Sequence, residues 1–295
     1  MNPITPEIFK AIEPKKYLEK FLDAGVRPDG RTSSSRSLFE VRTNVIESSL
    51  SSASVRIGDS MVIASIKSGI FSVPEGIVLV GTQAQGQLTV ACDYSLCALG
   101  ERRIAQLEGS RISKRIESVL NTRAVFDKSQ LDVQFAQDDE QQEELKKQTK
   151  PVWDICVDLL IVRDDGSVLD AALLAAVTAL ANTKLARINR ETMKVTDDSI
   201  PLQISTVPIG VSFCMYGSKF LVDPCGDEED VLPRIWIVVD AEKKKILGFY
   251  GPDLPRSSQY QYDPVPTLNI GSMFGSLFAM IGAEILKSRG TVVRQ

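Results

Sequence analysis

The residues of this chain that could do chemistry are its carboxylates, arginines, lysines, tyrosines and cysteines, because the 295-residue sequence contains no histidine. The absence of histidine excludes the Ser-His-Asp triad, the Cys-His dyad, histidine zinc sites and histidine-based proton transfer. The five cysteines are odd in number and never spaced Cys-x-x-Cys, which argues against a zinc knuckle or a disulfide framework and favours reduced thiols. From these residues we predict no catalytic nucleophile, no cofactor and no metal site.

Two short segments carry part of the pattern of a ligand site. Gly81–Leu88 has the two glycines of a phosphate-binding loop, but Gln87 and Leu88 stand where lysine and serine or threonine are required. The acidic run Asp227–Asp230 could bind Mg²⁺ through oxygen ligands, although a run of like charges is more often a solvated loop. We therefore interpret both segments as loops.

One predicted helix carries a cluster of basic residues. Arg102, Arg103, Arg111 and Lys114 could hold the phosphates of RNA if they face a shared channel, and they are the candidate RNA-binding residues. The helical pitch places Arg103, Arg111 and Lys114 near one stripe, whereas Arg102 and Arg115 are expected to point elsewhere. The alternative is a basic helix face that is solvated or contacts another subunit.

The charge and hydropathy of the chain limit its partners. Lys and Arg total 34 against 38 Asp and Glu, a net charge of −4, so no global basic field favours nucleic acid and any RNA contact must be local. The N-terminus lacks a secretory signal pattern, and no segment has the apolar length of a membrane span. The nearest approach, Leu268–Leu286, is interrupted by glycine and serine and is interpreted as a tightly packed core helix. We expect a soluble intracellular protein without a membrane partner.

Hydrophobic periodicity predicts the elements that must position these residues. Short helical pieces in Ile4–Leu22 and a turn at Val26–Arg31 precede a series of strands between Ser37 and Cys92. Glu101–Leu120 then changes to the period of an amphipathic helix. The polar insert 137–150 is predicted to be a solvated hairpin tip or loop.

The second half of the chain repeats this order of strands followed by a helix. After a strand at Val152–Val162, a helix begins at Ser167, with Ser167 and Asp170 spaced as a capping box. A closing helix is predicted over Val265–Ser288. The strands between these helices are predicted at Leu202–Ser205, Val207–Met215, Phe220–Val222, Ile235–Val239 and Ile246–Tyr250. Two halves of this kind predict an α+β protein built from related modules.

Three segments, in this order along the chain, resemble the RNase PH family and in particular the ring subunits of the RNA exosome. They are VRPDGR at Val26–Arg31, VDLLIVRDDGSVLDAALLAAVTAL at Val157–Leu180 and VDPCGDEEDVLPRIWIVVD at Val222–Asp240. The resemblance implies an RNase PH-type fold of two pseudo-duplicated β-rich modules with packed helices, similar to domain 2 of ribosomal protein S5. The implied parts are an N-terminal extension and turn at 1–36, a first module with the polar insert at 37–200 and a second module at 201–295.

The sequence departs from the active branch of this family at two places. Active members phosphorolyse RNA from its 3′ end with an acidic pair just after a D-P-x-x-x-E-E segment, where this chain reads Leu232-Pro233-Arg234. They also carry an arginine for phosphate at the start of the helix, where this chain opens Gly166-Ser167-Val168. A cationic Arg234 cannot act as a general acid or hold a metal ion as a carboxylate would. In contrast, Gly100-Glu101-Arg102-Arg103 resembles the RNA-binding arginine motif of active subunits.

The resemblance to the inactive branch implies a structural role in a six-membered hetero-oligomeric ring. The implied partners are other RNase PH-type exosome ring subunits, S1-domain cap subunits, a hydrolytic exosome nuclease and RNA passing through the ring channel. The implied process is 3′-to-5′ RNA processing and decay, including rRNA maturation and mRNA turnover, in the nucleus, the nucleolus and the cytoplasm. Two alternatives stay open: an active phosphate-dependent exoribonuclease that uses a divalent ion, and an isolated small-molecule enzyme.

Overall fold

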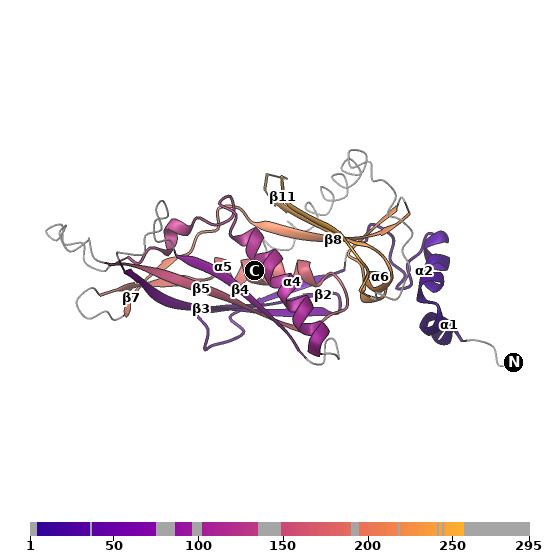
Figure 1. Cartoon of the computed structure of the whole chain (residues 1–295), viewed down its shortest axis with the longest axis horizontal. Coiled ribbons are helices and arrows are strands. Elements are labelled where there is room, and N and C mark those ends of the chain that lie inside the picture. Colours follow the sequence, from indigo (N-terminus) through magenta and orange to yellow (C-terminus); the bar gives the residue numbers. More distant parts are fainter. Residues whose placement is uncertain are drawn as a thin grey trace.

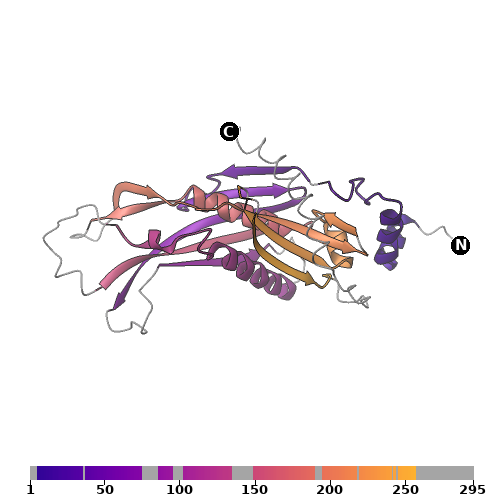
Figure 2. The same ribbon diagram turned by 90° about the horizontal axis from the view of Figure 1, so that it is seen from above.

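The structure, a computed structural model, has an α+β architecture in which two β-sheets enclose a helix (Figures 1 and 2). This confirms the predicted fold class. The residues that the structure describes are 5–35, 37–74, 86–95, 102–134, 149–189, 195–217, 219–240, 242–243 and 245–256.

The N-terminal segment forms two short helices, α1 (Pro6–Ile12) and α2 (Pro14–Asp23), as the sequence predicts. They lie at the end of the molecule next to the smaller sheet (Figures 1 and 2). Leu18 and Leu22 are four residues apart on α2 and are buried, because they share one helix face. Their apolar cluster contains Cys214, Leu221, Val231 and Leu232.

The larger sheet has the strand order β1-β2-β3-β5-β4. Every neighbouring pair in it is antiparallel except β4 and β5, which run parallel. Alternate residues of its strands are fully buried, including Val62, Ala64 and Ile66 of β3, as a sheet with one covered face requires. The strands are β1 (Phe39–Thr43), β2 (Ser51–Ile57), β3 (Ser60–Pro74), β4 (Gln87–Tyr94) and β5 (Thr149–Arg163).

Helix α4 (Arg102–Leu120) confirms the predicted basic helix and packs against β4. Gly109 allows this close approach, since a side-chain carbon there would lie 2.6 Å from the carbonyl oxygen of Cys92. The amide of Asn121, just after the helix, donates to the carbonyl oxygen of Leu88 at 3.0 Å. Helix α4 therefore covers the edge of the sheet that β4 would otherwise expose.

Helix α5 (Val168–Ala181) lies between the two sheets and contacts β2, β3 and β8. It is buried on almost every side, because both sheets cover it. The predicted capping box at its start is wrong. Ser167 has a left-handed φ of 50° and makes no capping hydrogen bond. Asp170 instead accepts hydrogen bonds from the indole of Trp236 at 2.9 Å and from both the main chain and the hydroxyl of Ser212.

The smaller sheet is antiparallel with the order β11-β10-β8-β9. Its strands are β8 (Pro208–Tyr216), β9 (Lys219–Val222), β10 (Arg234–Asp240) and β11 (Ile246–Asp253). A separate two-stranded sheet pairs β6 (Lys184–Ile188) with β7 (Val195–Pro201). The strand predicted at Leu202–Ser205 is wrong: the strand ends at Pro201, and Ile204 makes only an isolated bridge to Phe126.

Two short helices complete the described part: the 3₁₀ helix η1 (Lys128–Leu131) and α6 (Gly226–Val231). Some predicted features lie outside it: the closing helix at Val265–Ser288, most of the glycine-containing segment Gly81–Leu88, and the polar insert apart from its last two residues, which begin β5. No helix of the described residues is long and apolar enough to cross a membrane.

Candidate functional site

The candidate RNA-binding residues of α4 differ in their surroundings. Arg102 and Arg103 are the first two residues of the helix, and their side chains lie outside the described part of the structure. Lys114 is exposed to solvent. Arg111 is partly buried, with 26% of its side chain accessible, and it is engaged in ion pairs within the molecule.

Arg111 and Arg115 contact the same carboxylate. Arg115 donates to both oxygens of Asp253 at 2.7 Å, and Arg111 donates to one of them at 3.2 Å and to Glu108 at 2.5 Å. The expectation that Arg115 points away from Arg111 is therefore wrong, because residues four apart on a helix are neighbours. The guanidinium of Arg115 also lies 5.6 Å from the ring centre of Tyr250.

A second group of ion pairs surrounds Glu229. One of its carboxylate oxygens lies 2.6 Å from Arg256 and 3.3 Å from Arg234. Arg256 also contacts Asp164 at 2.9 Å, and the hydroxyl of Tyr94 donates to Asp164 at 3.1 Å. Glu229 is only 5% exposed, so these cations compensate a carboxylate that is almost removed from water.

The other oxygen of Glu229 holds the start of helix α5. The main-chain N–H of Ser167 donates to it at 2.8 Å, and the hydroxyl of Ser167 donates to the carbonyl oxygen of Pro224 at 3.1 Å. Gly166 has a φ of +91°, and a side-chain carbon there would lie 2.2 Å from the Pro224 oxygen. An internal carboxylate thus occupies the N-terminus of α5, where the helix dipole favours negative charge.

The acidic run is a helix with two buried members, and its interpretation as a solvated loop is wrong. Glu228 is 0% exposed and Arg27, in the N-terminal turn, is 1% exposed. Arg27 donates to the two oxygens of Glu228 at 2.8 and 2.5 Å and to the carbonyl oxygens of Val222 and Asp223. Two charges can be buried here because each has a partner with good geometry.

The local electrostatics favour the charged forms of Arg256 and Asp253. Burial opposes the charge of Arg256, but the carboxylates of Glu229 and Asp164 outweigh it and raise the pKa of Arg256. Burial alone would raise the pKa of Asp253, yet the hydrogen bonds and charge of Arg115 outweigh it and lower that pKa. For these two groups, the opposite charges nearby outweigh the cost of burial.

Residues from the ion pairs of Asp253 and from those of Glu229 line one small cavity of about 20 Å³ at the start of α5. That volume holds about one water molecule. The cations of the network are Arg111, Arg115, Arg234 and Arg256, and its anions are Glu108, Asp164, Glu229 and Asp253. Each of these four carboxylates has a cationic partner among the described residues.

Two of the positions singled out in the sequence, Val168 and Arg234, line the small cavity, and Leu232 lies in an apolar cluster. Val168 is 4% exposed and follows the residue that donates to Glu229. Leu232 is 5% exposed and packs in the apolar cluster with Leu18 and Leu22. Arg234 lines the small cavity and pairs with Glu229. Val168 and Leu232 are apolar and Arg234 is cationic, so none of these three positions supplies a carboxylate.

Sequence reasoning missed most of this network. Asp164 and Arg256 are 92 residues apart, and no pattern of periodicity or spacing connects them. Asp253 is the last residue of β11 and lies beyond the strand predicted at Ile246–Tyr250. The one available signal was the pair of adjacent glutamates in the acidic run, since a buried short helix needs cationic partners for them.

The comparisons with known proteins match this chain to one family. A family model described as "3′ exoribonuclease family, domain 1" of RNase PH matches residues 36–186. An exosome complex component Rrp42 of Sulfurisphaera tokodaii is 30% identical over 228 residues, covering 74% of each chain. An exosome complex component rrp43 of Schizosaccharomyces pombe is 25% identical over 257 residues, covering 82% of this chain and 86% of the relative.

Two solved structures have a similar fold. One is an archaeal exosome core, with a TM-score of 0.66, 23% identity and 94% of each chain covered. The other is an Archaeoglobus fulgidus exosome with RNA bound to the active site, with a TM-score of 0.68, 23% identity, and 94% of this chain and 97% of the other covered.

Proposed function

Because the chain belongs to the RNase PH family of 3′ exoribonucleases, we propose that it is a non-catalytic subunit of an RNA exosome core ring. Relatives named as exosome components cover about three quarters or more of its length, which supports a place in such a ring. The chain would contribute to the wall of the ring and its channel rather than to bond cleavage.

The internal ion pairs of Glu229 carry the non-catalytic part of this proposal. Its carboxylate holds the N-terminal amide of α5 at Ser167 and pairs with Arg234 and Arg256. A phosphorolytic subunit would need those donors for phosphate and would need an acid near Arg234. In this chain the Ser167 N–H is already bound to Glu229, and position 234 carries a cation in place of an acid.

The proposed partners follow from the proposed ring. They are other RNase PH-type exosome subunits on both flanks, S1-domain cap subunits, a hydrolytic nuclease and RNA in the channel. The process would be rRNA maturation and mRNA turnover in the nucleus, the nucleolus and the cytoplasm. The exposed Lys114 and the first residues of α4, Arg102 and Arg103, are the proposed RNA contacts of this subunit.

Two measurements test the proposal. Native mass spectrometry of the tagged protein from its own cells should give a complex that contains several RNase PH-type chains; a lone chain or a homo-oligomer would contradict ring membership. The purified chain, given a 3′-tailed RNA, inorganic phosphate and Mg²⁺, should release no nucleoside diphosphate. Phosphate-dependent release from a preparation free of other nucleases would instead identify an active phosphorolytic enzyme.

A further inference from the structure

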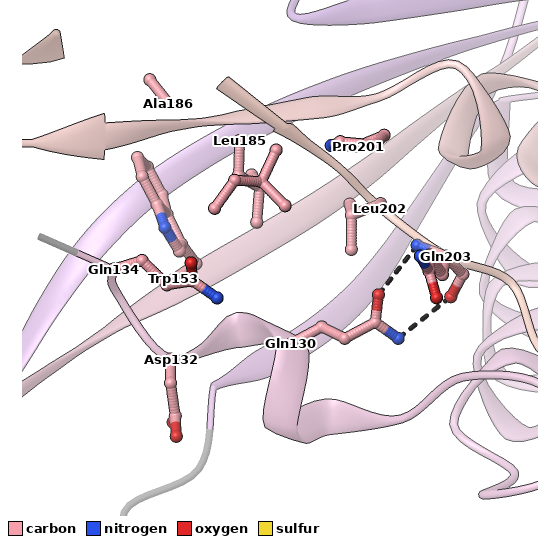
Figure 3. Close-up of a pocket in the computed structure, with 10 residues that line it drawn as sticks. Gln130, Asp132, Gln134, Trp153, Leu185, Ala186, Pro201, Leu202 and Gln203 are labelled. Carbon is pink, nitrogen blue, oxygen red and sulfur yellow. Dashed lines mark hydrogen bonds between the residues drawn. The ribbon is translucent and has the colours of Figure 1, made fainter. Parts of the chain in front are cut away.

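A cavity of about 240 Å³ lies beside the β6–β7 hairpin, at the end of the molecule opposite α1 and α2 (Figures 1 and 3). Trp153 of β5, Leu185 of β6 and Leu202 just after β7 form its apolar side, and all three are at least nine-tenths buried. Side-chain amides of Gln130 and Gln134 stand on the opposite side (Figure 3). The cavity thus combines an apolar surface with amide groups, which is typical of a binding pocket.

One wall of the cavity is the open edge of strand β6. Among the described residues, the strand pairs with β7 in a two-stranded sheet. Leu202 donates its main-chain N–H to Thr183, which stands directly opposite it in the register, so the main-chain groups of Thr183 and Leu185 point toward β7. Those of Lys184 and Ala186 point the other way, because main-chain direction alternates along a strand.

The hydrogen bond at the end of β6 supports this alternation. The N–H of Ile188 points away from β7 and donates to the carbonyl oxygen of Gln134 at 3.1 Å. Ala186 lines the cavity, and its orientation follows from the regular pairing at Lys184–Ala186, because the register shifts between Ala186 and Ile188. In the part of the chain that the structure describes, no strand pairs with Ala186 on that side. The edge therefore offers a main-chain donor and acceptor next to the cavity.

A side-chain amide already pairs with a peptide group at this cavity. Gln130 donates through Nε2 to the carbonyl oxygen of Gln203 at 3.0 Å and accepts through Oε1 from the N–H of Gln203 at 2.8 Å (Figure 3). This reciprocal pair is the one that a neighbouring strand makes. The amide of Gln134 is turned toward the space between Trp153 and Gln130 (Figure 3).

The charges around the cavity disfavour RNA. Among the described residues that line it there is no lysine or arginine, and Asp132 is the charged one. A phosphate chain would find no cation there and would be repelled by this carboxylate. A peptide without acidic residues meets no such cost, and its main chain suits a strand edge.

We propose that this cavity binds an extended peptide segment of a protein partner. The segment adds a strand to the open edge of β6, with main-chain hydrogen bonds to Ala186. One aliphatic side chain of the segment packs against Trp153, Leu185 and Leu202. This site is separate from the ion-pair network at α5 and does not depend on the proposed role in a ring.

The test uses the full-length chain, together with whatever subunits co-purify with it. Random peptides displayed on phage are selected on the immobilised protein, and the selected sequences are measured by isothermal titration calorimetry. We expect sequences with a recurring aliphatic residue and few acidic ones. Ala186→Pro should weaken their binding at least about tenfold, because it removes an edge N–H that is not needed for pairing with β7. Lys184→Ala, which keeps its N–H, is the matched control and should leave binding unchanged.

A change in the ligand provides a test that leaves the protein fold untouched. Two versions of the selected peptide are N-methylated at every second residue. Methylation of the N–H groups that face β6 should weaken binding about tenfold, whereas methylation of the intervening N–H groups should change it little, as strand pairing requires. Absence of any selected peptide, or binding that ignores both Ala186→Pro and N-methylation, would overturn the proposal. It would also be overturned if an oligouridine, and not a peptide, protected β6 from hydrogen exchange.

Discussion

Glu229 joins three separate parts of the chain through one carboxylate. It holds Ser167 at the start of α5, Arg234 at the start of β10 and Arg256 just after β11. A buried carboxylate is costly unless its lone pairs are used, and here both oxygens accept hydrogen bonds or pair with cations. The residue therefore connects the start of α5, the start of β10 and the segment after β11.

Removing one cation from this group should destabilise the surrounding elements strongly. Arg256→Met leaves Asp164 and Glu229 buried with too little positive charge, which typically costs about 3 kcal/mol or more. Hydrogen exchange mass spectrometry should then show faster exchange in α5 and α6. The matched control is Arg56→Met, which breaks an exposed pair with Asp59 and should cost about 0.5 kcal/mol or less. Equal effects of the two changes would contradict the structural role of Glu229.

The ion pair of Asp253 should make stability depend on pH in the acidic range. Its pKa is lower in the folded state than in the unfolded chain, so its stabilising contribution is complete above its unfolded pKa of about 3.9 and is lost as the pH falls through the folded pKa. Asp253→Asn should reduce the melting temperature at pH 7, and the difference from the wild type should shrink below about pH 4. A constant difference across this range would rule out the linkage.

At Gly109 of helix α4, helix propensity favours a larger residue, whereas the close contact with β4 requires glycine. Glycine inside a helix normally costs about 1 kcal/mol relative to alanine. At Gly109, however, a side-chain carbon would lie 2.6 Å from the Cys92 carbonyl oxygen of β4. The helix tolerates the glycine because its close contact with the strand edge depends on it.

Replacing this glycine should therefore destabilise the protein despite the gain in helix propensity. We expect Gly109→Ala to cost about 1–3 kcal/mol, as overpacking against a main-chain atom does. Ser110→Ala, at the exposed neighbouring position of the same helix, should change stability by about 0.5 kcal/mol or less. The melting temperatures of the two variants measure the contrast, and an increase for Gly109→Ala would show that the helix can move away from β4.

The elements that the sequence predicted correctly are those with a local signal. Alternating apolar residues predicted β5 and the first part of β3, and apolar residues that recur every four positions predicted α4. The capping box predicted at the start of α5 is absent, because Ser167 and Asp170 use their side chains for contacts with Pro224 and Ser212. Both partners come from the other half of the chain. A capping pattern has no information about such distant partners.

At the scale of the whole molecule, the resemblance of three segments was sufficient for the fold, whereas the candidate site was not predictable. The network depends on Arg115, Arg234 and Arg256, which lie on different elements and meet only after the sheets and α5 have packed. The basic residues of α4 therefore fall into two groups, those in internal ion pairs and those exposed to solvent. Arg111 forms an ion pair with Asp253 inside the molecule, and Lys114 is exposed to solvent.

This division gives a salt-dependent test in the assembled ring. If Arg102, Arg103 and Lys114 contact RNA phosphates, each contact contributes about 0.7 to the slope of the logarithm of affinity against the logarithm of salt concentration. Arg102→Glu with Arg103→Glu should therefore weaken RNA binding and flatten this slope by about 1.4, and Lys114→Glu should flatten it by about 0.7, while the ring still assembles. Fluorescence anisotropy with a single-stranded RNA at several salt concentrations measures the slope.

The control for a general loss of positive charge is Arg42→Glu. Arg42 is exposed on β1, at the opposite edge of the larger sheet from β4 and its helix α4, so the slope should not change. Arg111→Glu is a second comparison, because it places a carboxylate beside Asp253 and should reduce stability before it affects the slope. Failure of the ring to form with the Arg102 and Arg103 changes would mean that this end of α4 contacts a neighbouring subunit. Unchanged affinity and slope in an intact ring would mean that these side chains are only solvated.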